Sequence, residues 1–401
     1  MKKHDESRGR REFLRTAGLG VLGAGFLGAP AFGRAVRGAA GGPALPRTGA
    51  PLGPQAPATV SLVKGGDRRE IIHQALKLIE DDVWAAVDRK KRVLIKPNMA
   101  VDKNPLAITH VDAVRAVLEF LKPRCRKPIT VAESGVLNTA DGFKANGYYA
   151  LEKEFGVTVV DLNASPVWKP YYVFTKDQVP QPMRVYADFV DPDVCLISLA
   201  RMKTHDTVLV TLSLKNVLMA APVNDYKQSD KGYLHGAEKS LNDIMHFNLF
   251  HMAHRVWPDL AVIDGFESME GRGPAWGTPL DTRLALASRD PLAADLVGTK
   301  IMGFDSSRIL YLKAMAEAGM GAPSRRVSPE AATAAGASAA SDGGTSIRLR
   351  SPSSVRIAAA LSSGLFPDPH LGEWMQEGQP ASHGQSRRRA RVWARSSSRT
   401  R

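Results

Sequence analysis

The chain has 401 residues, of which 44% are hydrophobic, and a formal net charge of +14 at pH 7. The excess charge lies at the two ends: residues 1–58 carry a net charge of +6 and residues 322–401 carry +7, whereas residues 59–321 hold 33 basic and 32 acidic side chains. A body this close to neutral excludes nucleic acid as its expected partner, because nucleic-acid-binding surfaces are strongly basic.

Residues 1–35 have the features of an export signal. The paired Arg10 and Arg11 precede a Gly-rich, weakly apolar run, an arrangement that resembles a twin-arginine (Tat) signal peptide. The run is too short and too rich in Gly to span a bilayer comfortably, so we expect no permanent membrane span. The sequence therefore predicts export by the Tat machinery to the periplasm or the extracellular space, with residues 36–58 as a linker.

Segments with strand and helix character alternate through the next part of the chain. Short apolar runs that end in polar residues predict strands, and apolar residues spaced three or four apart predict helices. In chain order, the expected elements are a strand at 60–65, a helix at 69–79, a strand at 92–98, a helix at 109–122, a strand at 129–135, a helix at 147–156, strands at 157–162, 194–205 and 260–265, and a helix at 290–303.

Two of these helices carry N-cap signals. Thr109 is the expected N-cap of the helix at 109–122, and Asp290 is the expected N-cap of the last helix. The β-α-β-α-β order predicts a single main α/β domain over 59–321, with a largely parallel or mixed sheet flanked by helices and with disordered tails.

Residues 322–401 differ in composition from the rest. They contain no lysine, although residues 59–321 contain nineteen, and Ser, Ala and Arg dominate. We therefore expect a low-complexity, disordered tail. Two alternatives stay open for this segment: a basic arm that binds an anionic partner, and a segment translated from a shifted reading frame of a GC-rich gene.

Polar side chains follow several of the predicted strands at the point where each strand ends. In an open parallel sheet these ends meet at one edge, which is where ligands bind. The expected ligand-binding residues are Lys96, Asn98, Glu133, Lys215 and Asn216. The expected catalytic residues are His205, Lys203 and Asp264. The lysines would supply positive charge to a small anionic ligand, and His205 would do acid–base work.

A divalent metal is a second hypothesis for the same edge. The side chains that could bind it are His205, Asp264, Glu267 and Glu270. The cofactor is otherwise unknown. The two cysteines, Cys125 and Cys195, are far apart in the chain, so we expect no iron–sulfur cluster. Each polar group also has an ordinary alternative, as a surface lysine, a structural histidine or a turn-forming aspartate.

A series of motifs from about residue 62 to residue 321 resembles the bacterial and archaeal family called domain of unknown function 362. The motifs are IKPN (95–98), ITHVDAVRAVLEFL (108–121), VAESG (131–135), KTH (203–205), TLSLKN (211–216), VIDGFESMEGRGPAWGTP (262–279), SRDPLAADLVGTKIMGFD (288–305) and YLKAMAEAGMG (311–321).

The resemblance implies an α/β fold and no settled activity. Some members of the family have an export signal, and others carry a ferredoxin-type cluster module whose cysteines this chain lacks. The resemblance ends at Gly321, where a further strand and a terminal element would be expected.

Two functions are consistent with these patterns. The first is an exported enzyme that acts on a small anionic ligand, with or without a divalent metal. The second is a non-catalytic protein that binds a cofactor or metal, or that helps to mature an exported redox enzyme. An enzyme should hold a titrating group next to a reactive pocket, whereas a carrier should hold its ligand without turnover.

Overall fold

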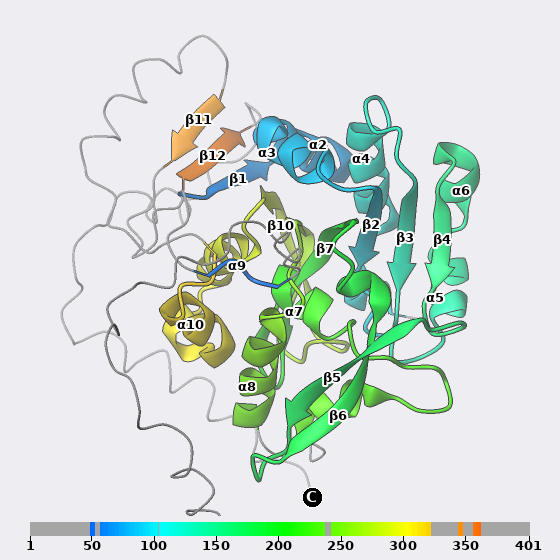
Figure 1. The fold of residues 1–401 in the computed structure, drawn as a ribbon. Coiled ribbons are helices and arrows are strands. Elements are labelled where there is room, and N and C mark those ends of the chain that lie inside the picture. Colours follow the sequence, from blue (N-terminus) through cyan, green and yellow to red (C-terminus); the bar gives the residue numbers. More distant parts are fainter. Residues whose placement is uncertain are drawn as a thin grey trace, which may run out of the picture. The chain divides into compact units, whose positions relative to one another are not determined.

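A mixed β-sheet with helices on both faces forms the centre of the molecule (Figure 1). The computed structural model describes residues 49–52, 57–102, 104–236, 242–321, 344–347 and 356–361. All of them belong to a compact unit that spans residues 47–401. The predicted signal and most of the predicted linker lie outside the described residues.

Five parallel strands make up one side of the sheet, in the order β9, β7, β2, β3 and β4, with β4 at the edge. Their bounds are Leu260–Glu270 for β9, Val194–His205 for β7, Arg92–Pro97 for β2, Ile129–Glu133 for β3 and Thr158–Asp161 for β4. β7 lies in the centre, and its 12 residues are almost all buried, as expected for a strand covered on both faces.

Antiparallel strands extend this parallel core. β10 (Thr278–Ser288) pairs with β9, β1 (Thr59–Lys64) pairs with β10, and the short β8 (Leu209–Thr211) pairs with the end of β7. The prediction of an α/β domain with a mixed sheet flanked by helices is confirmed. β10 was not predicted, since the first half of its sequence is exposed and lacks an apolar run.

Two short strands come from the segment for which disorder was expected. β12 (Arg356–Leu361) pairs in parallel with β1, and β11 (Gly344–Ile347) pairs with β12. The other residues of 322–401 lie outside the described part, so the disorder expected for them stays a prediction.

Successive side chains of a strand point to opposite faces of the sheet. The central strands are apolar at successive positions, so both faces of the sheet are apolar and both are covered by helices. On one face lie α2 (Arg68–Lys77), α3 (Glu80–Val87) and α4 (Val111–Leu121), which pack on strand residues such as Ile95 and Ile197. On the other face lie α7 (Ser213–Leu218), α8 (Asn242–Ala253), α9 (Pro291–Ile301) and α10 (Leu310–Glu317), which pack on residues such as Leu94 and Leu196.

The remaining helices are short. α5 (Thr139–Ala145) and α6 (Ala150–Phe155) lie between β3 and β4, and the 3-10 helices are η1 (Pro105–Ala107), η2 (Ala187–Phe189), η3 (Asp230–His235) and η4 (Ser306–Arg308). Among the described residues, every helix is too short or too polar to cross a lipid bilayer.

A separate antiparallel hairpin lies beside α8 (Figure 1). It consists of β5 (Trp168–Phe174) and β6 (Pro180–Tyr186). This hairpin was missed because prolines interrupt both of its strands and many of its side chains are exposed, so no apolar period marks it.

The predicted N-cap of α4 is wrong by one residue, whereas the predicted cap Asp290 of α9 is confirmed. His110 caps α4, and its ring accepts from the backbone N–H of Asp112. The Thr109 hydroxyl has other partners: it accepts from the backbone N–H of Asn98 and donates to the Leu199 carbonyl, each at 2.8 Å. It therefore joins the end of β2 to the middle of β7 instead of starting the helix.

Candidate functional site

A cavity of about 190 Å³ lies at the carboxyl ends of β2 and β3, beside the extension of β7 beyond its neighbours. We call it the lysine pocket. Its charged and polar lining consists of Lys96, Asn98, Glu133, Ser134, Lys203, His205, Thr211, Lys215, Asn216, Lys231 and His235. The four lysines keep at most 6% of their surface exposed. The pocket therefore gathers four buried amines around one buried carboxylate.

The path of the chain after β7 brings the predicted residues Lys215 and Asn216 into the pocket. β7 passes the end of β2, turns through β8, and leads directly into α7, which carries Lys215 and Asn216. The carboxylate of Asp295, buried on α9, accepts from the backbone N–H groups of Ser213 and Leu214 at 2.8 and 2.9 Å. This contact holds the first turn of α7 at the edge of the sheet.

Lys96, Glu133 and Asn216 form a connected polar group. The Lys96 ammonium lies 2.9 Å from a carboxylate oxygen of Glu133 and donates to the side-chain oxygen of Asn216 at 2.6 Å. The amide of Asn216 donates to the Lys96 carbonyl and to the hydroxyl of Ser198 on β7. Lys96 is thus fully engaged with the protein itself.

Lys203 and Lys231 are also held by hydrogen bonds. The Lys203 ammonium donates to the carbonyls of Ala107 and Pro274 at 2.8 and 3.0 Å. The Lys231 ammonium donates to the hydroxyl of Ser134 at 3.0 Å and to the carbonyls of Met219 and Ala220. Neutral acceptors satisfy the N–H groups of these lysines but do not balance their charge.

Lys215 is the exception among the four. Within the described residues, no hydrogen bond or ion pair reaches its amine. The hydroxyl of Thr211 and the side-chain oxygen of Asn98, which also line the pocket, are buried and have no partner within the described part of the chain. Buried polar groups are rarely left without partners, and one explanation is a ligand that completes them.

Burial lowers the pKa of all four lysines. For Lys215, burial and then the neighbouring Lys96 lower the pKa to about 7. Burial likewise lowers the pKa of Lys231 to about 7, with Glu133 acting in the opposite direction. The pKa values of Lys96 and Lys203 are also lowered, chiefly by burial. A negative charge in the pocket would reverse these shifts.

His205 lines the same pocket with its ring largely buried. Its Nδ1 accepts from the backbone N–H of Thr207 at 3.0 Å, so the proton of the neutral ring is on Nε2. Burial, followed by Lys215 and Lys203, lowers the pKa of His205, which keeps the ring neutral. In this state the histidine is a hydrogen-bond donor through Nε2.

The loop between β9 and β10 closes one side of the pocket. Gly273 lies so close to β7 that a side chain there would meet the Thr204 carbonyl, 2.0 Å from the position of a Cβ. The Gly273 carbonyl accepts from the backbone N–H of Asp206, and the next residue, Pro274, supplies the carbonyl that Lys203 binds. The sequence GRGPAWGTP (271–279) thus contributes a wall of the pocket.

The structure places the three predicted acidic residues of β9 outside this pocket. Asp264 is buried beside Arg68 of α2, with 3.3 Å between the guanidinium and the carboxylate. Glu267 pairs with Arg201 at 2.6 Å, and Glu270 is exposed at the end of β9. Because β9 continues past its bulge on the far side of β7, its carboxylates do not face Lys96.

The four side chains proposed for a metal are therefore not gathered. Among the described residues, no group of three or more His, Cys, Asp or Glu side chains is arranged to hold a metal ion. Cys125 and Cys195 are both buried and free. The roles predicted for individual residues stay predictions, but seven of them line one cavity: Lys96, Asn98, Glu133, Lys203, His205, Lys215 and Asn216.

Lys231, Ser134 and His235 line the pocket and were not among the predicted site residues. Ser134 directly follows Glu133 at the end of the predicted strand, so the strand-end argument placed it at this edge without giving it a role. Lys231 and His235 lie on η3, in a loop sequence with no strand before it, and local pattern gives no signal for them.

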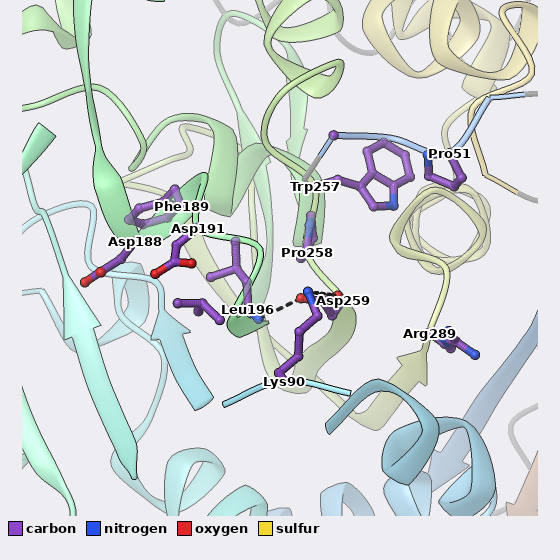
Figure 2. A pocket seen from close by; sticks show the side chains of 12 residues that line it. Pro51, Lys90, Asp188, Phe189, Asp191, Leu196, Trp257, Pro258, Asp259 and Arg289 are labelled. Atoms are coloured by element: carbon purple, nitrogen blue, oxygen red, sulfur yellow. Dashed lines mark hydrogen bonds and ion pairs between the residues drawn. The ribbon is translucent and has the colours of Figure 1, made fainter. Parts of the chain in front are cut away.

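A second cavity, of about 200 Å³, lies at the opposite, amino ends of β2, β7 and β9 (Figure 2). Several of its charged groups have partners in the protein: Lys90 lies 2.9 Å from Asp259, whose carboxylate also accepts from the backbone N–H of Leu196. Asp188 and Asp191 both pair with Arg92. Three carboxylates and two basic side chains line this cavity, whereas four lysines and one carboxylate line the other, so the lysine pocket is the better candidate for an anion site.

The fold and the pocket define an α/β protein with a lysine-lined cavity at the carboxyl edge of a mixed sheet. Residues 93–300 match the family described as "Domain of unknown function (DUF362)", and the chain belongs to that family. It is 29% identical over 233 residues to the Thylakoid-associated protein sll1697 of Synechocystis sp., a match that covers 57% of this chain and 68% of the relative. No solved structure matches the chain.

Proposed function

We propose that this protein is exported and binds a small anionic molecule in the lysine pocket, as an enzyme of the DUF362 family. The observation that supports binding is the imbalance of charge: four buried lysines face one buried carboxylate. Burying an ammonium group without a counterion costs on the order of several kcal/mol, even after the protein relaxes. A bound anion would offset that cost, and Lys215 has no partner in the described structure that would compete with it.

The size of the cavity favours a small ligand. The volume of about 190 Å³, lined by residues of β2, β3, β7, α7, η3 and the loop before β10, is below the roughly 300–1,000 Å³ of pockets for drug-sized ligands. The pocket also has neutral acceptors, Thr211 and Asn98, next to its cations. A ligand with at least one carboxylate or phosphate group and one hydrogen-bond donor would satisfy both kinds of group.

Binding of simple anions is the first test. Sulfate and malonate should bind to the full-length protein near neutral pH in isothermal titration calorimetry, and the Lys215→Met substitution should weaken binding about tenfold or more, as expected for the loss of one charge-assisted hydrogen bond. The control is Lys313→Met, on the exposed side of α10.

The dependence on pH gives a second measurement on the same samples. Sulfate affinity should fall as the pH is raised from about 6 to about 9, because Lys215 and Lys231 lose their protons near pH 7. Sulfate keeps its charge over this range, so the change would come from the protein. The absence of binding at millimolar concentrations, or equal binding by the Lys215→Met protein, would contradict the proposed anion site.

Export is the second part of the proposal, and it rests on Arg10 and Arg11 ahead of the Gly-rich apolar run. The double substitution Arg10→Lys with Arg11→Lys should leave the protein in the cytoplasm, because paired guanidinium groups make contacts that ammonium groups do not reproduce. The matched control is Arg8→Lys with Arg15→Lys, which preserves the pair. Cell fractionation reports the outcome, and normal export of the first variant would refute the Tat assignment.

A further inference from the structure

The lysine pocket contains one amine that differs from the other three in its contacts. Lys96 is bound by Glu133 and Asn216, while Lys203 and Lys231 each donate to at least two acceptors. Lys215 makes no such contact within the described residues, although it is just as deeply buried. Acceptors around an ammonium group favour its protonated form, so an amine without them loses its proton more readily, and only the unprotonated amine has a lone pair available for bond formation.

We propose that Lys215 is a nucleophile that forms an imine with a small carbonyl compound bearing an anionic group, such as a 2-oxo acid. This inference rests on the proposed anion site, because the other lysines must hold the anionic group. Lysine amines become nucleophilic near neutral pH when they are desolvated or placed beside other cations, and both conditions hold here.

The chemical step balances without any further reactant. The Lys215 nitrogen attacks the carbonyl carbon, a C–N bond forms, and a proton moves from nitrogen to the former carbonyl oxygen. The remaining proton on nitrogen then passes to that oxygen, the C–O bond breaks and the oxygen leaves as water, so that amine and carbonyl become a neutral imine and water with no change in oxidation state. No oxidant, reductant or metal is required.

Other side chains of the pocket could bind the anionic group and the carbonyl oxygen of the substrate during imine formation. Lys203 and Lys231 lie on the pocket wall, where a carboxylate or phosphate group would favour their protonated forms and pair with them. His205 is neutral and carries its proton on Nε2, so it can donate a hydrogen bond to the carbonyl oxygen as negative charge develops there. Uptake of a proton from solvent would make the imine positively charged, and Asp206 is the acidic residue whose charge acts on the Lys215 nitrogen.

The ionisation of Lys215 agrees with this role. Its pKa is lowered to about 7, chiefly by burial, so about half of the amine is unprotonated at neutral pH. An ordinary lysine, with a pKa near 10.4, is unprotonated in roughly one molecule in a thousand under the same conditions. The larger unprotonated fraction supports the assignment of Lys215 as the nucleophile, which rests on its lack of contacts within the described residues.

Trapping of the imine by reduction with cyanoborohydride tests the proposal on the full-length wild-type protein. Pyruvate is added near neutral pH, the imine is reduced with cyanoborohydride to a stable secondary amine, and the modified lysines are located by peptide mass spectrometry. Lys215 should be labelled at least tenfold faster than the exposed Lys313, which serves as an internal control. Acetone, which has the carbonyl without the carboxylate, should label Lys215 with a much smaller preference over Lys313.

The outcomes separate this inference from the proposed function. Preferential labelling of Lys215 that malonate suppresses supports both. If malonate binds to the protein while pyruvate labels Lys215 no faster than Lys313, the imine inference is overturned and the anion site stands. If malonate does not bind and labelling is uniform, both are overturned. Labelling of Lys203 or Lys231 in place of Lys215 would also overturn the assignment.

Discussion

The free energy of unfolding should rise as the pH is raised from about 7 to about 8.5, by up to ~2 kcal/mol for each of Lys215 and Lys231. Both pKa values are lowered to about 7 in the folded protein, whereas an unfolded lysine titrates near pH 10.4. Below pH 7 both states are protonated and the cost of the buried charges is fully present. Above pH 7 the unfolded chain binds protons that the folded protein has lost, so stability increases with pH.

Other buried groups contribute with the opposite sign, so the experiment needs a matched variant. Burial raises the pKa of Asp295 to about 8 and raises the pKa of the Cys195 thiol, and both groups make the fold less stable as the pH rises through this region. Urea unfolding of the wild type and of the Lys215→Met, Lys231→Met double variant, in buffers without multivalent anions, isolates the two lysines. The lysine-dependent gain should be missing from the variant, and equal pH slopes would show that these amines are not buried as charges.

Replacement of Glu133 by glutamine should lower the free energy of unfolding by about 3–5 kcal/mol near neutral pH, the cost of leaving one partner of a buried ion pair alone. Glu133 and Lys96 are each only 2% exposed and lie 2.9 Å apart. Without the carboxylate, Lys96 has either to remain charged in the interior or to release its proton. Chemical denaturation measures the loss directly.

Two further variants distinguish the ion pair from a general effect of substitution. Glu154→Gln removes a carboxylate that pairs with Arg115 at the surface, and it should cost about 1 kcal/mol or less. Adding Lys96→Met to Glu133→Gln should recover part of the stability, because no uncompensated charge then remains. A loss below about 1 kcal/mol for Glu133→Gln would mean that solvent or another group already satisfies Lys96.

Local patterns predicted the parallel core and three of the helices that flank it, α2, α4 and α9. The strands at 92–98, 129–135 and 194–205 were found because a strand buried on both faces is a short apolar run, and this signal depends only on neighbouring residues. The polar ends of those strands were predictable for the same reason. A parallel sheet brings the ends of neighbouring strands together, so residue order alone was enough to place Lys96, Glu133 and Lys203 at one edge.

The sequence was a poorer guide where contacts between distant segments determine the position of a side chain. Lys231 reaches the pocket because η3 is anchored by Arg184 of β6, which pairs with Asp230 at 2.8 Å and donates to it through its backbone N–H. Arg184 and Asp230 are 46 residues apart, so the hydrophobic periodicity of either segment gives no sign of this pairing. Asp264 follows an apolar run in the same way as Lys96 does, but its partner is Arg68, far away in the chain.

Lys96 lies in the lysine pocket and Asp264 lies outside it, although both follow apolar runs, and the physical reason is the same for both. Residue type and spacing decide whether a segment becomes a strand and which residue ends it, because side chains alternate between two faces. Which face of the sheet meets which helix, and how far each strand continues past its neighbour, depends on packing of the whole chain. The bulge between β7 and β9 and the return of the chain through α7 set these features, and they leave Lys215 buried beside three other lysines.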